Sequence, residues 1–328
     1  MTSAAPLPAS TILITGGSGS LGSAIAIQIA KSQPGKHHLI LTARKPSDET
    51  TINTSAALRS LGASFEFQAL DLSSLEHVKS FAAKLTERSK KGEVPPFDGG
   101  GVALSAAMLT YVKDSRTKDG WNEVYGINVL AQVLFMRELL PVLGGAMVIV
   151  IASATHAIGS VDYFLAETIE NCKGADGTSQ REQETFGLSE AMKRYGSSKL
   201  LFVMASYALQ RRINAKPSNT TQIINLDPGG MSGDSRMGSD ASWILRFVKL
   251  LLVVFGPMVR WLKKDAFNPP EVPAKAISDL LGRGDGNLGG KYFILDDEVT
   301  SSAVSLDVKL QGEVWAKVCR DLGMGLET

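Results

Sequence analysis

The sequence predicts an α/β fold in one domain, with a parallel sheet covered by helices on both faces. Three observations predict it. Short apolar runs alternate with segments of helical periodicity along the 328 residues. A glycine-rich turn over residues 15–22 directly follows the first apolar run. The run over residues 146–151 is apolar throughout, which is typical of a strand buried on both faces of a parallel sheet.

The elements follow from local patterns of apolar, polar and turn-forming residues. We expect strands in seven segments, namely 11–14, 38–45, 65–72, 102–107, 146–151, 222–226 and 289–295. We expect the main helices over 25–30, 121–143, from Tyr195 onwards, over 270–281 and over 307–322. A loop is expected over 86–101, and a surface excursion with one short helix between Ser153 and Tyr195.

Composition excludes several classes of function. A charged content of 20% and a hydrophobic content of 44% are ordinary for a soluble enzyme. The formal net charge of +1 leaves no basic excess for a nucleic-acid partner. Cys172 and Cys319 lack metal-ligand spacing, which fits a reducing compartment and no metal site. Residues 1–10 lack the pattern of a signal peptide, so a cytoplasmic location is expected.

The glycine-rich turn lies between an expected strand and an expected helix. Glycines there allow the backbone to approach a pyrophosphate, and the helix N-terminus supplies free N–H groups. A plain tight turn is the alternative. After the second strand, Ala43 leaves no acid for a ribose 2′-hydroxyl, whereas Arg44 and Lys45 offer charge for a 2′-phosphate. These residues favour NADP over NAD, and a solvated charge pair is the alternative.

Tyr195 and Lys199 are four residues apart in an expected helix and therefore share one face. A fixed ammonium beside a phenol favours the phenolate, so we expect Lys199 to lower the pKa of Tyr195 from ~10. Such a pair alone is common on surface helices. Ser153 follows the 146–151 run at the edge where ligands bind in open α/β sheets. The position of Asn128 between apolar neighbours, taken alone, predicts a hydrogen-bonded amide in the core. His156 is a single histidine, and we assign it no role.

Residues 243–262 are strongly apolar but contain Arg246, Lys249 and Arg260, with Gly256-Pro257 in the middle. A spanning helix needs roughly 20 apolar residues without central charges. We therefore expect no spanning segment. A lid over a lipophilic substrate is favoured, and peripheral membrane contact is the alternative.

In their order, these motifs resemble those of the short-chain dehydrogenase/reductase family over about residues 11–235. The resemblance implies a single Rossmann-type domain over 1–328, with a cofactor-binding and catalytic core over 10–235. It leaves an insertion over 154–190, because Tyr195 follows Ser153 at a longer interval than is usual in the family. An apolar lid is expected over 236–268.

The resemblance also implies a set of cofactor-binding residues: Thr15, Gly16, Gly17, Ser18, Ser20, Leu21, Gly22, Arg44, Lys45, Asp71, Leu72, Ser105, Ala106, Asn128, Tyr195, Lys199, Pro228, Gly229 and Ser232. Two departures from the family stand out. Ser20 replaces the middle glycine of the turn, with Gly19 one place earlier. The usual Asn-Asn-Ala-Gly after the fourth strand is replaced by Leu-Ser-Ala-Ala over residues 104–107.

By the same resemblance, Asn128, Ser153, Tyr195 and Lys199 form the catalytic tetrad. Tyr195 is implied to exchange the proton with the substrate oxygen, and Ser153 to hold and polarise that oxygen. Lys199 is implied to bind the nicotinamide ribose and lower the tyrosine pKa. Asn128 is implied to anchor a water that relays protons to Lys199.

The leading hypothesis is an NADP(H)-dependent enzyme that interconverts a ketone and a secondary alcohol on a bulky lipophilic substrate, such as a polyketide, terpenoid or steroid. The stretch around Lys291 and Trp315 resembles the retinol-dehydrogenase-like and fungal specialised-metabolism branches. One alternative is an isomerase, dehydratase or cyclase without net redox chemistry. Another is a non-catalytic NADP-binding partner protein. The family implies a homodimer or homotetramer through the helices that carry Asn128 and Tyr195.

Overall fold

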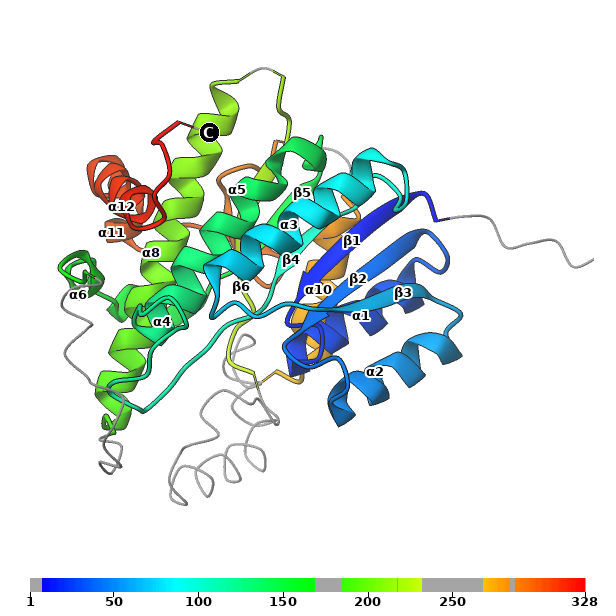
Figure 1. Cartoon of the computed structure of the whole chain (residues 1–328), viewed down its shortest axis with the longest axis horizontal. Coiled ribbons are helices and arrows are strands. Elements are labelled where there is room, and N and C mark those ends of the chain that lie inside the picture. The colour runs from blue at the N-terminus through cyan, green and yellow to red at the C-terminus, as the bar shows by residue number, and fades with distance from the viewer. Residues whose placement is uncertain (1–7, 169–184, 217, 232–267, 284–286, 328) are drawn as a thin grey trace, which may run out of the picture.

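An eight-stranded sheet forms the centre of the protein, in the order β3-β2-β1-β4-β5-β6-β7-β8 (Figure 1). The structure, a computed structural model, describes residues 8–168, 185–216, 218–231, 268–283 and 287–327. The strands are β1 (Ser10–Thr15), β2 (His37–Ala43), β3 (Ser64–Ala69), β4 (Gly101–Leu104), β5 (Met147–Ile151), β6 (Gln222–Asp227), β7 (Tyr292–Ile294) and β8 (Asp297–Val299). Strands β1 to β7 are parallel, which confirms the predicted fold class, and β8 pairs with β7 in antiparallel orientation.

The helices of the described residues connect these strands. They are α1 (Ser20–Ser32), α2 (Glu49–Ser60), α3 (Leu75–Lys90), α4 (Glu123–Tyr125), the π-helix η1 (Gly126–Leu130), α5 (Ala131–Leu143), the 3-10 helix η2 (Ala154–Ile158), α6 (Asp162–Leu165), α8 (Leu188–Asn214), α10 (Glu271–Leu281), α11 (Ala303–Leu306) and α12 (Val308–Asp321).

Two hydrophobic cores lie on opposite faces of the sheet, because successive side chains of a strand point to opposite faces. Leu13 of β1 belongs to the core with α3, α5, α8 and α12. Ile12 and Ile14 belong to the core with α1, α2 and α10. In Figure 1, α3 and α5 lie side by side on one face, and α12 packs beside α8. Helices therefore cover both faces, as predicted.

The carboxyl ends of the central strands lie at one edge of the sheet. Thr15 of β1 pairs with Leu104 of β4, and Ile151 of β5 pairs with Leu226 of β6. The glycine-rich turn and the segments that follow β4, β5 and β6 therefore leave the sheet side by side. This edge is where ligands bind in open α/β sheets.

Several predicted boundaries are wrong. Residues 86–90, expected in a loop, continue α3. Helix α8 begins at Leu188, inside the expected insertion, and η2 and α6 occupy the start of that insertion. β7 is not the final strand, because β8 follows it. The expected lid over 236–268 falls almost entirely outside the described residues, as do residues 169–184 of the insertion.

The expected helix over 121–143 is three consecutive elements, α4, η1 and α5. Among the described residues, Glu123–Leu143 is the one helical stretch long and apolar enough to cross a membrane, by length and composition only. Of its most apolar window, 72% is buried inside the protein. The stretch is part of the core, as its contacts with α3 and the sheet require.

Candidate active site

Helix α8 carries Tyr195 and Lys199 on one buried face. The two side chains are 6% and 2% exposed. The Lys199 Nζ donates a hydrogen bond of 2.7 Å to the carbonyl oxygen of Ile151 and lies 5.6 Å from the centre of the Tyr195 ring. Ile151 ends β5, two residues before Ser153. This bond therefore fixes the ammonium at the carboxyl edge of the sheet, close to the start of the Ser153 turn.

Asn128 lies in the π-helix η1 and connects two other parts of the site. Its Nδ2 donates to the carbonyl oxygen of Met108 (2.8 Å) and to the Oγ of Ser198 (3.0 Å). Its Oδ1 accepts from the Met108 N–H at 2.8 Å. Single π turns inside α-helices occur frequently at functional sites. The Asn128 amide thus joins the segment after β4 to the residue that precedes Lys199.

Ser153 is the N-cap residue of η2. Its Oγ accepts hydrogen bonds from the N–H (3.3 Å) and the Oγ1 (3.0 Å) of Thr155. A hydroxyl has one donor proton and two acceptor sites. With its acceptor sites turned towards Thr155, the Ser153 hydroxyl keeps its proton for a further oxygen acceptor.

Gly196, directly after Tyr195, allows η2 to pack against α8. A Cβ atom at Gly196 would lie 2.3 Å from the carbonyl oxygen of Thr155, and one at Gly159 would lie 2.6 Å from the carbonyl oxygen of Gly196. Real Cβ atoms essentially never approach this closely. Two glycines therefore set the distance between the Tyr195 helix and the Ser153 turn. This role of the two glycines was not predicted from the sequence.

The expected direction of the pKa shift of Tyr195 is wrong in this structure. Burial, and secondarily the negative charge of Asp227, raise the pKa of the Tyr195 hydroxyl above its usual value. Burial lowers the pKa of Lys199 from 10.5 to about 8, and Asp227 opposes this change. The physical reason is that loss of water disfavours the charged form of both groups. Tyr195 is therefore a protonated phenol at neutral pH.

The glycine-rich turn is held against β2 and shaped for a phosphate. The N–H of Gly17 donates to the carbonyl oxygen of Thr42 at 2.8 Å. Gly16 has a φ of +66°, and a Cβ at Gly22 would lie 2.3 Å from the carbonyl oxygen of Gly16. Helix α1 begins at Ser20, so its first N–H groups, which have no partner within the helix, face this turn. The turn thus fits the pyrophosphate of a dinucleotide.

In this turn, the departure at Ser20 is explained by the helix boundary. Gly19 is the N-cap residue of α1, and its N–H donates to the carbonyl oxygen of Gly16 at 2.8 Å. Ser20 is already helical, with φ values of the right-handed region available to any residue. Leu21 is buried in the core beneath the turn. A glycine is therefore not required at position 20.

The segment with the second departure from the family, which follows β4, is hydrogen-bonded to the end of β1 and to α5. The Ser105 Oγ donates to the carbonyl oxygen of Thr15 (2.5 Å), and the Ala106 N–H donates to the Thr15 Oγ1 (3.1 Å). The Gln132 Nε2 donates to the carbonyl oxygen of Ala106 at 2.8 Å. Ser105 and Ala106 therefore lie beside the glycine-rich turn. Gln132 was missed, since nothing in the sequence distinguishes it from a surface amide.

Residues expected at the adenosine end of the cofactor lie after β2 and β3. Arg44 and Lys45 are both exposed. Burial raises the pKa of Asp71, but hydrogen bonds from Lys118 and Ser73 outweigh it and lower the pKa to about 2. The Asp71 carboxylate is therefore ionised. Leu72 is buried, which leaves its backbone as the group available to a ligand.

The turn after β6 brings a buried carboxylate to the site. The Asp227 Oδ1 accepts from the N–H of Gly229 at 2.9 Å, and Gly229 has a φ of +71°. Pro228 lies between them, and Ser232 is outside the described residues. Asp227 was missed by the sequence analysis, although it acts on the pKa of both Tyr195 and Lys199.

The fold and the site are those of a class of protein, the nicotinamide-dependent oxidoreductases. A model of the KR domain matches residues 10–168. Human polyprenol dehydrogenase is 25% identical over 332 residues, which cover 97% of this chain and 87% of that protein. A short-chain dehydrogenase of Talaromyces variabilis is 26% identical over 288 residues, which cover 77% of this chain and 78% of that protein.

Solved structures share the fold. A short-chain dehydrogenase from Burkholderia cenocepacia J2315 in complex with NADP aligns with a TM-score of 0.59 at 17% identity, covering 88% of this chain and 97% of that one. The chain is similar over most of its length to members of the short-chain dehydrogenase/reductase family. These findings support an NAD(P)-dependent oxidoreductase of that type.

Proposed function

We propose that this enzyme uses NADP(H) to interconvert a ketone and a secondary alcohol on a bulky lipophilic substrate. One observation carries the proposal: Tyr195 and Lys199 share a buried face of α8, and Lys199 is hydrogen-bonded to the end of β5, next to the Ser153 turn. A hydroxyl donor, a phenol and a cation therefore lie towards the same edge of the sheet, the edge at which ligands bind in open α/β sheets.

The cofactor supplies or accepts the hydride. In the reductive direction, the Ser153 hydroxyl donates a hydrogen bond to the carbonyl oxygen and stabilises the negative charge that develops there. The raised pKa of Tyr195 keeps its proton in place until that oxygen becomes basic. Lys199 would hold the ribose of the cofactor and, as an ammonium, would offset the negative charge left on the phenolate.

The preference for NADP rests on the end of β2. Ala43 has no carboxylate that would repel a 2′-phosphate, and the exposed Arg44 and Lys45 follow it. An arginine can bind a phosphate through two parallel N–H donors. The glycine-rich turn proposed to receive the pyrophosphate is hydrogen-bonded to Thr42 of the same strand, so it lies close to the end of β2.

The lipophilic substrate class rests on an exposed apolar side chain in the helical turn that Ser153 caps. Ile158 of η2 is 60% exposed, and its Cγ1 lies 3.5 Å from the position of a Cβ at Gly196 of α8. Exposed apolar side chains at a site favour an apolar ligand. The relative named polyprenol dehydrogenase supports the same class, since a polyprenol is a long apolar alcohol.

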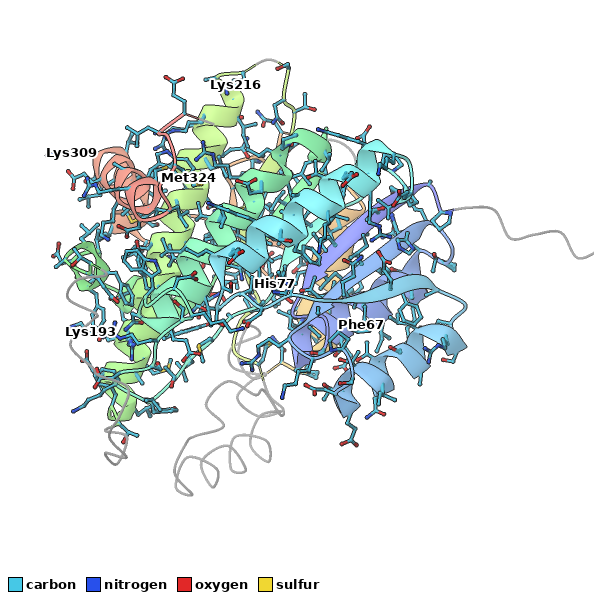
Figure 2. The ribbon with its side chains drawn as sticks, viewed as in Figure 1. Phe67, His77, Lys193, Lys216, Lys309 and Met324 are labelled. Atoms are coloured by element: carbon cyan, nitrogen blue, oxygen red, sulfur yellow. The ribbon has the colours of Figure 1, made fainter. Side chains whose placement is uncertain are left out.

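The cofactor proposal is tested by titrating NADPH and NADH into wild type, Arg44→Ala and Lys309→Ala. Lys309 is the matched control, an exposed cation on α12 at the far end of the molecule from Phe67 of β3 (Figure 2). We expect Arg44→Ala to raise the Kd for NADPH about tenfold and to leave the Kd for NADH unchanged. Equal affinities for the two nucleotides in wild type, or no change in Arg44→Ala, would refute the preference.

The reaction is tested by following the nicotinamide absorbance with a panel of hydrophobic ketones and secondary alcohols. Tyr195→Phe is the inactive control, because it removes the hydroxyl and keeps the ring. Turnover by wild type and none by Tyr195→Phe supports the proposal. Product formed without an absorbance change would instead establish non-redox chemistry on the same fold.

A further inference from the structure

We propose that His156 is a positioning residue that fixes the backbone of Ser153 and couples it to the segment after β8. The proposal rests on the role given above to Ser153. The His156 ring is 5% exposed. Its Nδ1 lies 2.7 Å from the carbonyl oxygen of Ser153, and its Nε2 lies 3.1 Å from the backbone N of Ser302.

These two contacts determine where the ring proton is. A backbone N–H only donates, so Nε2 must accept the hydrogen bond from Ser302 with its lone pair. A carbonyl oxygen only accepts, so Nδ1 must carry the proton that it donates to Ser153. Both requirements are met by one species, the neutral imidazole with its proton on Nδ1. The Tyr292 hydroxyl oxygen, 3.3 Å from Nδ1, is then a second acceptor of the same proton.

The bond from Nδ1 fixes the peptide that follows the catalytic serine. The carbonyl oxygen of Ser153 also accepts from the backbone N–H of His156 at 3.0 Å, which closes the first turn of η2. With the ring N–H as a second donor, the plane of this peptide is held from two directions. The Cα–Cβ bond of Ser153 is attached to that plane, so the direction in which its hydroxyl points depends on both bonds.

The other side of the ring is held by a segment far away in the sequence. The Ser301 Oγ lies 2.9 Å from the hydroxyl oxygen of Tyr207 on α8, and the Ser305 Oγ donates to the Ser301 Oγ at 2.7 Å. These bonds anchor the chain on both sides of Ser302. The His156 ring therefore spans from this anchored segment to the Ser153 turn, and all of these groups are buried or partly buried.

Two variants test the hydrogen bonds of the two ring nitrogens separately. The Asn side-chain N–H lies near the place of Nδ1–H, so His156→Asn keeps the bond to Ser153 and loses the one to Ser302. The Gln oxygen reaches the place of Nε2, so His156→Gln keeps the bond from Ser302. We expect His156→Asn to retain kcat within about threefold and His156→Gln to lose about tenfold or more, since small displacements of a reacting group are costly. The KM for NADPH should not change in either.

Thermal unfolding of the same variants separates positioning from a merely structural role. Each variant loses one hydrogen bond, so we expect similar melting temperatures despite different kcat values. Ser302→Ala is the control, because it keeps the backbone N–H and should retain the wild-type kcat. Equal loss of kcat in His156→Asn and His156→Gln, or loss that follows the melting temperature, would overturn the proposal.

A second readout needs no turnover. The chain has four histidines, and the ring ¹⁵N signals of His156 are those that disappear in His156→Asn. We expect nitrogen shifts of the neutral Nδ1–H tautomer at neutral pH, and signals of the Nε2–H tautomer or of imidazolium would refute the assignment. An inactive wild type with the expected tautomer would contradict the proposed function and leave the two hydrogen bonds of His156 supported.

Discussion

The substitution Gly196→Ala tests how the catalytic helix and the Ser153 turn are brought together. The new Cβ would lie 2.3 Å from the carbonyl oxygen of Thr155, whereas ordinary contact begins at 3.4 Å. The backbones of α8 and η2 would therefore have to separate by about 1 Å. Neither atom belongs to a flexible side chain, so neither can move away alone.

The magnitude follows from two opposing terms. Overpacking in a close-packed core costs about 1–3 kcal/mol, and a contact between two backbones belongs at the upper end. Alanine in place of glycine in a helix contributes about 1 kcal/mol of stability. The net loss of stability for Gly196→Ala is about 2 kcal/mol, which for a chain of 328 residues corresponds to a fall in Tm of about 3 °C.

Gly312→Ala is the matched control. Gly312 is also helical, lies exposed on α12, and has no atom within 4 Å of the position of its Cβ. At Gly312 the substitution brings only the gain in helical propensity, about 1 kcal/mol, and should raise Tm by about 1.5 °C. Thermal unfolding followed by circular dichroism measures both. Equal changes in Tm for the two variants would refute the close approach of α8 and η2.

Catalysis gives a second measure of the same contact. Because Ser153 caps η2, a separation of about 1 Å moves its hydroxyl relative to Tyr195, and losses of about a hundredfold follow from such displacements. The kcat of Gly196→Ala is measured with a ketone that wild type reduces, below the Tm of the variant. A wild-type kcat in the folded variant would show that the spacing does not position the serine.

Three further outcomes are expected. Burial lowers the pKa of Lys199 to about 8, so between about pH 8 and pH 10.5 the unfolded chain binds more protons than the folded protein. The free energy of unfolding therefore rises with pH in this range. Urea unfolding should show this rise in wild type and not in Lys199→Met. Lys317 and Asp321 form a buried ion pair, so Asp321→Asn alone should lower the free energy of unfolding by about 3–5 kcal/mol. The decrease should be smaller when Lys317→Met is added, and a double-mutant cycle measures both. Thr15→Val leaves the N–H of Ala106 without its acceptor and should cost about 1–3 kcal/mol in chemical unfolding; an unchanged midpoint would contradict that hydrogen bond.

Much of the fold and of the site was predictable because the signals are local. Strands buried on both faces are continuous apolar runs, and the glycine-rich turn lies between a strand and a helix within a few residues. Tyr195 and Lys199 share a helix face at a fixed spacing. Helix α2 was missed because its sequence, rich in threonine and serine, has low helical propensity, and packing against the sheet decides its structure.

The parts that were not predictable depend on contacts between distant residues. His156 and Ser302 are 146 positions apart, and no local pattern indicates that the ring accepts from that N–H. The raised pKa of Tyr195 on α8 depends on its burial and on Asp227, which ends β6. The π turn at Asn128 leaves no signature in composition, because it differs from an α-helix only in the register of its backbone hydrogen bonds.

The segment after β8 has a consequence for the order in which contacts form during synthesis. Ser302 donates to the His156 ring, Lys317 donates to the carbonyl oxygen of Glu167, and Asp321 accepts from the hydroxyl of Tyr125, which precedes the π turn. The ribosome produces residues 302–321 after β1 to β6 and after the glycine-rich turn. These additional contacts to the Ser153 turn and to the helix before the π turn can therefore form only late in synthesis.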